Sequence, residues 1–376
     1  MTQPCASLQD RGAGRAFFLA PEPPSLTAGG GGLRSASLLE YLRSRYAVDV
    51  ATFTLPHHSR GAAARAWRNA VRVLSARPPL FDRFSGFEEQ VAAQARGPYR
   101  VAVIEHFWCA PYAAVLRPHA EVLALNLHNV ESELAATHAL ATRWPASMAF
   151  RRFAAAYREL EREWLRRFDL VLAASEEDRR RVEHSRVHVY PNALPEIPQP
   201  EAPEEDCVVF SGNLEYHPNV EAVRWFRREI WPRLRQRFPR LEWRLVGRNP
   251  QAVRRYVAGD DRIVLTGPVE NAVDSLAPAK VCVAPLRSGS GTRFKILEAW
   301  AAARAVVSTT LGAEGLGARA GEHLLLADDA AGFADAVARL LEDRELRRAL
   351  GQAGRALYLE RYTWPAAWRS LEEAGL

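Results

Sequence analysis

Short apolar runs alternate with longer helical patterns along the first half of the chain. The strand-like runs are Ala16–Ala20, Val48–Phe53, Val101–Ile104, Val122–Leu127, Leu170–Ala174 and Val187–Tyr190. Most of these runs are apolar throughout, which is typical of strands covered on both faces in a parallel sheet. Helical patterns, including Leu33–Arg45 and Met148–Phe168, separate some of them. The first half therefore predicts a parallel α/β domain.

A proline-rich stretch at 191–203 precedes a second alternation of the same kind. Strands are expected at Val208–Phe210, Trp243–Val246, Ile263–Leu265, Val281–Ala284 and Ala305–Ser308, and helices at Asn219–Phe238, Arg293–Ala303, Ala331–Glu342 and Glu345–Arg361. Two βα alternations joined by a linker indicate two doubly wound, Rossmann-like α/β domains that face a cleft. We expect these boundaries: a first domain at 1–190, a linker at 191–206, a second domain at 207–358, and a helix within 359–376 that packs back on the first domain.

The second half contains a glycine-rich loop with an unusual lysine. Among fifty basic residues only Lys280 and Lys295 are lysines, and Lys295 follows the glycines of Ser288–Thr292. Glycines and a helix N-terminus let backbone N–H groups approach a phosphate, and lysine adds a compact charge. With Arg293 and Glu298 beside it, the loop predicts a diphosphate site. The alternatives are a simple pair between Lys295 and Glu298, and a solvated Arg293.

Other polar positions follow predicted strands, where the ligand crevice of an open α/β sheet lies. Gly29–Gly32 follows the first strand, but the third glycine of a dinucleotide fingerprint is replaced by Arg34 or Ser35, which disfavours a nicotinamide oxidoreductase. His128 and the Glu105-His106 pair also follow strands, and each can serve a substrate or cap a neighbouring helix. Ser211–Asn219 opens the second domain, and Asn219 is expected to be a helix N-cap.

Composition and charge indicate which kinds of molecule the protein is expected to bind. The net charge of +6 and the pI of about 9.3 fit an anionic substrate or a membrane surface, and no nucleic-acid-binding motif is present. The four cysteines are far apart, and no signal peptide or transmembrane run is recognisable, so the cytoplasm is expected. The arginine-rich helices predicted at 60–77 and 148–168 fit either anionic lipid at the inner face of the plasma membrane or plain solvation.

A family resemblance covers nearly all of 207–363 and rests on 210–219, 245–247, 267–269, 284–299, 306–309 and 312–316. In these segments the chain resembles the retaining glycosyltransferases of family 4, within the group 1 glycosyl transferases, which have the GT-B fold. In the first half, 29–34, 128–131 and 189–192 fit landmarks of the same family.

The resemblance implies that the second domain binds a nucleotide-diphosphate sugar and the first domain an acceptor. Glu298 matches the second acid of the family's Glu-x7-Glu motif, a ribose ligand, whereas Ser290 stands where the first acid would be. His128 matches the histidine placed beside the transferring sugar. The predicted catalytic residues are His128, Lys295 and Arg293. The predicted donor-binding residues are Gly30, Gly31, Gly212, Asn213, Gly247, Val269, Ser290, Gly291, Thr292, Ile296, Leu297 and Glu298.

The expected reaction is transfer of a sugar, with retention, to a glycan, lipid-linked or small-molecule acceptor in polysaccharide or glycoconjugate synthesis. No metal site and no cofactor are predicted, because no Asp-x-Asp follows a strand and cations can neutralise the leaving diphosphate. Two alternatives stay open. One is a nucleotide-sugar epimerase of the same fold. The other, prompted by Ser290, is a nucleotide- or glycan-binding protein without turnover.

Overall fold

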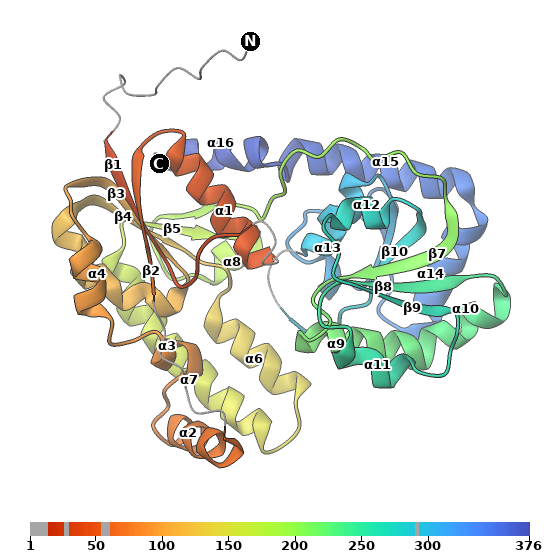
Figure 1. Cartoon of the computed structure of the whole chain (residues 1–376), viewed down its shortest axis with the longest axis horizontal. Coiled ribbons are helices and arrows are strands. Elements are labelled where there is room, and N and C mark those ends of the chain that lie inside the picture. The colour runs from red at the N-terminus through yellow and green to blue at the C-terminus, as the bar shows by residue number, and fades with distance from the viewer. Residues whose placement is uncertain (1–13, 26–29, 54–60, 290–292) are drawn as a thin grey trace, which may run out of the picture.

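The computed structural model describes residues 14–25, 30–53, 61–289 and 293–376. Two parallel β-sheets, each flanked by helices, form two units that lie side by side (Figure 1). The chain passes from the first unit to the second through the extended segment after residue 189, and its last helix returns to the first unit. The predicted doubly wound α/β architecture is confirmed.

The first sheet has the strand order β2-β1-β3-β4-β5-β6, with all neighbours parallel. Its strands are β1 (Arg15–Ala20), β2 (Ala47–Thr52), β3 (Tyr99–Glu105), β4 (Ala120–Asn126), β5 (Leu170–Ala173) and β6 (Val187–Val189). Its helices are α1 (Gly30–Arg43), α2 (Ala62–Leu74), α3 (Pro79–Arg83), α4 (Glu88–Gln94), α5 (Ala113–Leu116), α6 (Glu131–Ala141), α7 (Ala146–Trp164) and α8 (Glu176–Arg181), with 3-10 turns at Phe107–Tyr112, Arg117–His119 and Leu165–Arg167.

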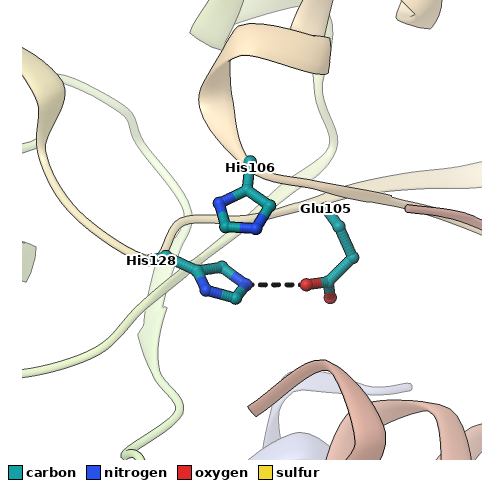
Figure 2. Close-up of side chains that lie close together, drawn as sticks. All are labelled: Glu105, His106 and His128. Atoms are coloured by element: carbon teal, nitrogen blue, oxygen red, sulfur yellow. Dashed lines mark hydrogen bonds and ion pairs between the residues drawn. The ribbon is translucent and has the colours of Figure 1, made fainter. Parts of the chain in front are cut away.

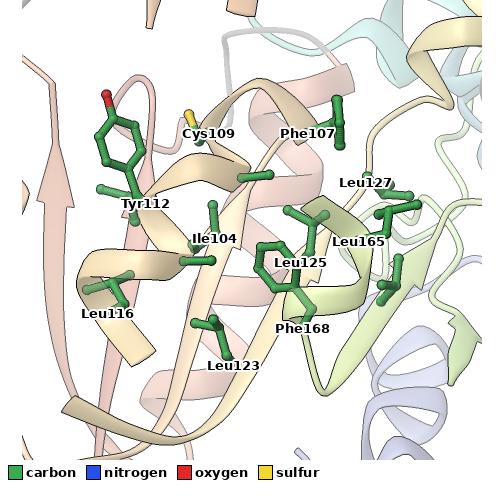
Figure 3. Packing of buried hydrophobic residues seen from close by; sticks show 14 of the residues in the cluster. Ile104, Phe107, Cys109, Tyr112, Leu116, Leu123, Leu125, Leu127, Leu165 and Phe168 are labelled. Atoms are coloured by element: carbon green, nitrogen blue, oxygen red, sulfur yellow. The ribbon is translucent and has the colours of Figure 1, made fainter. Parts of the chain in front are cut away.

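Alternate residues of one strand enter two different cores, which is why the strands are apolar on both faces. Phe17 and Leu19 of β1 belong to a core that also contains residues of α5, α7 and the 3-10 turn at Phe107–Tyr112, and Figure 3 shows part of it. Ala16 and Phe18 belong to the opposite core, which includes residues of α1. The sheet is thereby covered by packed side chains on both faces.

The second sheet has the order β12-β11-β10-β7-β8-β9, again all parallel. Its strands are β7 (Glu205–Ser211), β8 (Glu242–Val246), β9 (Ile263–Gly267), β10 (Ala279–Ala284), β11 (Ala305–Ser308) and β12 (Leu325–Leu326). Its helices are α9 (His217–Trp225), α10 (Trp231–Arg237), α11 (Gln251–Val257), α12 (Ala272–Leu276), α13 (Phe294–Ala301), α14 (Ala330–Glu342) and α15 (Arg344–Arg361), with a 3-10 turn at Leu311–Ala313.

Two predicted helices differ from the observed ones. The single helix expected over 219–238 is divided, because a π-helical turn at Phe226–Ile230 separates α9 from α10. Pro232, in the first turn of α10, has no N–H to continue an α-helical ladder, which accounts for the interruption. The helix expected from Leu33 begins at Gly30, so glycines form its first turn.

The last helix, α16 (Trp364–Ala374), contacts α1 and β6 of the first unit. The Tyr41 hydroxyl donates to the carbonyl of Leu376, and the Trp368 indole N–H donates to Ser37. Between the units, Arg181 pairs with Glu314 at 3.1 Å. The contacts of α16 and the Arg181–Glu314 pair therefore join the two units.

Candidate active site

The glycine-rich loops of both units lie at the points where strand order reverses. In the first sheet the order reverses at β1 and β3, and in the second at β7 and β10. Loops at the carboxyl ends of such strands form the usual ligand crevice of doubly wound sheets. The segments after β1, β3, β7 and β10 hold most of the predicted site residues.

The first turns of α1 and α13 meet across the two units (Figure 1). A Cβ atom placed on Gly30 would lie 2.4 Å from Cδ2 of Phe294, so no larger residue fits without movement. Leu33, one turn further, packs against the core of the second unit. Glycine costs about 1 kcal/mol in a helix relative to alanine, and this close approach is the compensating reason for its use.

His128 and Glu105 form a buried hydrogen-bonded pair in the first unit. Figure 2 shows Nε2 of His128 facing the Glu105 carboxylate, and the distance to Oε2 is 2.7 Å. The same carboxylate accepts hydrogen bonds from Ser35 at 2.5 Å and Asn126 at 2.8 Å. Burial alone would raise the pKa of Glu105, but these donors outweigh it and hold the pKa below its ordinary value. Glu105 is therefore an ionised acceptor.

An ionised Glu105 determines which nitrogen of His128 carries the proton. Burial lowers the pKa of His128 despite the opposing effect of its hydrogen bond to the carboxylate, so the ring is neutral at pH 7. Its Nε2–H then donates to Glu105, and Nδ1 is left as an acceptor. Nδ1 faces Gly31, because a Cβ placed on Gly31 would lie 3.5 Å from it. The acceptor nitrogen thus points toward the first turn of α1.

Arg34 stands where a dinucleotide fingerprint would have glycine, and it is buried. Its guanidinium donates to Oδ1 of Asn126, to the carbonyl of Tyr190 and to Oδ1 of Asn192. It also lies over the Tyr190 ring, 4.6 Å from the centroid. The Arg34 network binds the carboxyl end of β4, α1 and the segment after β6 together beneath the His128–Glu105 pair.

Glu105, His106 and His128 are close enough together to be considered as metal ligands. The arrangement does not favour a metal ion. The rings of His106 and His128 are stacked with centroids 3.7 Å apart, so their in-plane lone pairs run side by side instead of converging. Nε2 of His128 is already bonded to Glu105. We interpret the cluster as a hydrogen-bonded support for His128, and metal independence stays a prediction.

Lys295 lies in the first turn of α13, with its amino group beside the β7 loop. Nζ donates to Oδ1 of Asn219 at 2.9 Å and lies 5.0 Å from the centroid of the Phe210 ring. A Cβ placed on Gly212 would be 3.5 Å from Nζ. Burial, reinforced by Arg293 and opposed by Glu298, lowers the pKa of Lys295 to about 7. Such a desolvated cation is poised to gain from an anion.

This contact corrects one expectation and removes one alternative. Asn219 is not an N-cap: Tyr216 holds that position, and Asn219 is the third residue of α9. Its Nδ2 donates to the carbonyl of Asn213, which leaves Oδ1 for Lys295. Lys295 is likewise not hydrogen-bonded to Glu298, whose Oε2 accepts from the Ser211 hydroxyl at 3.1 Å. Burial raises the pKa of Glu298, with Ser211 and Lys295 opposing.

Gly212 and Gly247 allow two backbone segments of the second unit to come into direct contact. Gly212 and Gly247 have φ values of 143° and 140°, which disfavour residues with a side chain. A Cβ placed on Gly247 would lie 1.9 Å from the carbonyl oxygen of Gly212. The loops after β7 and β8 are therefore in direct contact, and the backbone of Gly212 forms part of the surface beside Lys295.

Arg293 is the residue before α13 and is buried. Its guanidinium donates to the carbonyl of Gly289 at 2.8 Å, which joins the residue before α13 to the segment after β10. Burial lowers the pKa of Arg293, while Tyr216, Glu314 and Asp178 oppose that shift. Arg293 thus brings positive charge close to Lys295, and its predicted catalytic role stays a prediction.

The remaining predicted donor residues differ in position. Asn213 is exposed, and its side chain bonds to Asn249 at 3.0 Å; Val269 is exposed after β9. The side chains of Ile296 and Leu297 lie in the hydrophobic core, and their backbone N–H groups bond to the Arg293 carbonyl. The structure gives these two a packing role. Ser290, Gly291 and Thr292 lie outside the described residues.

Sequence reasoning missed the residues that support the site. Asn126 was not considered, Ser35 was noted only as a break in the glycine pattern, and Asn192 only within the 189–192 segment of the family resemblance. Glu105 was considered only with its neighbour His106. One signal was available, since Glu105 and Asn126 are the last residues of β3 and β4 and lie opposite each other in the sheet. Polar side chains at the carboxyl ends of adjacent apolar strands lie close together, so they are expected to form one site.

Comparison with solved structures shows which fold this is. Sucrose-phosphate synthase from Thermosynechococcus elongatus has a TM-score of 0.72 at 19% identity, covering 96% of this chain and 98% of that one. Anabaena HepE in complex with UDP-glucose has a TM-score of 0.67 at 14% identity, covering 96% and 99%. The E. coli trehalose-6-phosphate structure bound with UDP-2-fluoro glucose has a TM-score of 0.63 at 14% identity, covering 96% and 98%. The fold is GT-B.

The second unit of this GT-B chain also has a sequence match. Residues 205–343 match the family model of the Glycosyl transferases group 1. An uncharacterized 44.6 kDa protein in the cps region of Klebsiella pneumoniae is 25% identical over 135 residues. That match spans 34% of this chain and 35% of the Klebsiella protein. The unit that holds Lys295 and Glu298 is therefore supported as a group 1 glycosyltransferase domain.

Proposed function

We propose that the protein is a retaining glycosyltransferase of family 4 that uses a nucleotide-diphosphate sugar as donor. The observation that carries the proposal is the position of Lys295. A cation with a pKa lowered to about 7 by burial lies at a helix N-terminus beside Gly212, and its hydrogen-bond partner is the neutral amide of Asn219. Perturbed charges of this kind are concentrated at functional sites.

The donor would lie with its diphosphate at the start of α13. Lys295, Arg293 and the helix N–H groups supply positive charge there, and the charge of the diphosphate grows as the sugar leaves. Glu298 would accept hydrogen bonds from the ribose, as the resemblance to family 4 implies. UDP-sugars are the first donors to test, because HepE and the E. coli structure are solved with UDP-sugars.

His128 would act on the sugar from the opposite unit. Its Nδ1 acceptor faces the first turn of α1, and Glu105 fixes the ring so that the acceptor stays on that side. A sugar hydroxyl donating to Nδ1 would orient the anomeric carbon. Glu105 is then a positioning residue, because it acts through His128.

Retention follows if the acceptor attacks the face that the diphosphate leaves. The bond between the anomeric carbon and the phosphate oxygen breaks, and its electron pair stays on the phosphate. The acceptor oxygen bonds to the same face of the anomeric carbon, and its proton passes to the leaving phosphate. No cofactor or divalent metal takes part in this sequence, because Lys295 and Arg293 neutralise the diphosphate.

The acceptor in this proposal is a glycan, a lipid-linked sugar or a small molecule, bound mainly by the first unit. We assign the reaction to cell-surface polysaccharide or glycoconjugate synthesis at the cytoplasmic side of the membrane. The similarity to a protein from a Klebsiella cps region fits this assignment. The functional division would be an acceptor unit at 1–190 and a donor unit at 207–358.

The direct test combines binding with product analysis. Thermal unfolding is measured with UDP-, GDP- and ADP-sugars in EDTA, because a ligand of the native state raises the midpoint. The stabilising donor is then incubated with candidate acceptors, and the anomeric configuration of the product is read by NMR. We expect one nucleotide to stabilise the protein without metal and the product to retain the donor's configuration. An inverted product, or activity that needs Mg²⁺ or Mn²⁺, would contradict the proposal.

A further inference from the structure

Helix α2 exposes a row of apolar side chains to solvent. Trp67, Val71 and Leu74 are spaced i, i+4 and i+7, which places them on one face of a helix. Their exposed fractions are 73%, 43% and 76%. An ordinary surface helix turns such a stripe toward the core. The polar contacts of α2 hold it in this orientation, since Arg72 bonds to Asp82 and the carbonyl of Leu74 accepts from Arg152 of α7.

A second group of exposed apolar side chains lies at the turn between α6 and α7. Leu140, Trp144 and Met148 are 83%, 79% and 54% exposed. Met148 is one helical turn before Arg152 on α7, and Arg152 contacts the end of α2. Figure 1 places α2 and the α6–α7 turn at the same lower end of the first unit. We name these six side chains, Trp67, Val71, Leu74, Leu140, Trp144 and Met148, the tryptophan face.

The chain around the tryptophan face is uniformly basic. Residues 61–81 and 134–158 contain eight arginines and no aspartate or glutamate. Arg72 and Arg158 pair with acids from outside these segments, Asp82 and Glu133. Arg65, Arg143 and Arg151 are exposed. The charge is therefore complementary to an extended anionic surface.

We infer that the tryptophan face docks on an anionic lipid bilayer. Tryptophan side chains favour the boundary between head groups and acyl chains, and arginines beside them bind anionic head groups. Two copies of the chain pressed together through this face would oppose arginine to arginine, so a membrane fits the charge better than self-association. In the part of the chain that the structure describes, no helix is both long and apolar enough to span a bilayer, so the contact is peripheral.

The docking surface belongs to the unit assigned to the acceptor. A lipid-linked acceptor would then be presented to the unit that holds His128; this last step rests on the proposed function, whereas docking itself does not. Binding to vesicles and turnover with a water-soluble acceptor can therefore fail independently.

The test is cosedimentation of the full chain with vesicles of phosphatidylcholine alone or mixed with phosphatidylglycerol. One variant combines Trp67→Ser with Trp144→Ser, and a second combines Arg65→Glu with Arg143→Glu. The matched control carries Leu359→Ser and Arg228→Glu, exposed positions of the second unit. All these side chains lie at the surface, so unfolding midpoints should stay close to that of the wild type.

We expect the wild type and the control to bind the anionic vesicles, added salt to weaken binding, and each first-unit variant to lose at least about tenfold in affinity. Turnover with a soluble acceptor should be unchanged in both variants. Equal vesicle binding by the tryptophan variant would overturn the inference. So would self-association of the wild type that the tryptophan variant abolishes while anionic vesicles leave it unaffected.

Discussion

The amino group of Lys295 lies 2.9 Å from Oδ1 of Asn219, so the first turn of α13 is tied to the first turn of α9. The side chain reaches this point beside Gly212, where backbone forms the wall. A compact ammonium group fits such a site, whereas the planar guanidinium of arginine needs more width. This relationship explains why an otherwise arginine-rich chain has lysine at this position.

Lys295→Ala should lower kcat by about a hundredfold or more, because removal of one preorganised stabiliser of developing charge typically costs about 3–4 kcal/mol. Donor affinity should fall less, since the charge of the diphosphate is smaller before the bond breaks. Lys295→Arg should recover only part of the activity. Steady-state kinetics measure both effects.

Lys280 provides the matched control. It pairs with Asp206 at the start of β10, away from the glycine-rich loop. Lys280→Arg should therefore behave as wild type. Equal activity of Lys295→Arg and wild type would remove the argument for a lysine-specific phosphate contact.

Donor affinity should fall as the pH rises above 7. The charged form of Lys295 binds the diphosphate, and burial lowers its pKa to about 7 in the free protein. Binding an anion raises that pKa, so below pH 7 the proton is already present and affinity is constant. Above pH 7 a proton must be taken up, and affinity drops by up to about tenfold per pH unit. Calorimetry in buffers of different ionisation enthalpy would detect the proton uptake that accompanies binding. Lys295→Met should abolish both this uptake and the dependence of donor affinity on pH.

Glu105→Gln should impair catalysis through His128. The carboxylate holds Nε2–H of His128 and raises the pKa of that ring against the effect of burial. Without it the ring is free to turn, and we expect kcat to fall about tenfold or more with a smaller change in KM. The limb of the pH–rate profile that reports His128 should shift to lower pH, because the pKa of His128 decreases. A loss of activity that tracks only a lowered unfolding midpoint, with an unmoved profile, would assign Glu105 a structural role.

Gly30→Ala should weaken donor binding by preventing the two units from meeting. The added methyl group would lie 2.4 Å from the Phe294 ring, and overpacking of this kind costs about 1–3 kcal/mol, or roughly fivefold to 150-fold in affinity. The first unit itself should not lose stability, because alanine favours a helix over glycine. Titration with the nucleotide diphosphate measures the effect. Combining Gly30→Ala with Phe294→Leu should restore part of the affinity; no recovery would show that the contact is not the cause.

Glu131→Gln should stabilise the fold increasingly as the pH rises from about 5 to 8. Burial, with Glu161 nearby, raises the pKa of Glu131 to about 8, whereas the unfolded chain ionises near the ordinary value. The folded state therefore holds a proton that the unfolded state releases, and stability falls with rising pH by up to about 1.4 kcal/mol per unit. Urea unfolding across this range should give a flatter profile for Glu131→Gln. The control is Glu133→Gln, because Glu133 is half-exposed and pairs with Arg158. Its unfolding free energy should depend on pH as that of the wild type does.

The fold was predictable because its signals are local. Runs such as Val101–Ile104 are apolar at every position, since each strand is buried on both faces, and the proline-rich segment stands between two such series. The start of α1 was missed because three glycines do not resemble a first helical turn. Gly30 is explained by its contact with Phe294, which comes from the other unit, and Gly31 by its position facing His128.

The clustering of charged side chains was predictable where one segment carries them, as at Arg293 and Lys295, whereas their function stays a prediction. The hydrogen-bond partners of these side chains were not predictable, because they come from different helices and strands. Asn219 was expected to cap its own helix, yet it bonds to a residue 76 positions away. Arg34 looked like a defect in a glycine pattern, yet it bonds to Asn126 and Asn192 across the first unit. Pairings of this kind are set by the tertiary fold.

The central claim is that a nucleotide-diphosphate sugar is activated beside Lys295 without metal. The most direct measurement is release of nucleotide diphosphate from a panel of UDP-, GDP- and ADP-sugars with mixed acceptors in EDTA, comparing wild type, Lys295→Met and Lys280→Met. The account predicts release from at least one donor by the wild type and by Lys280→Met, and a loss of about a hundredfold or more in Lys295→Met. Equal release by Lys295→Met and wild type, or no release without added divalent metal, would contradict it.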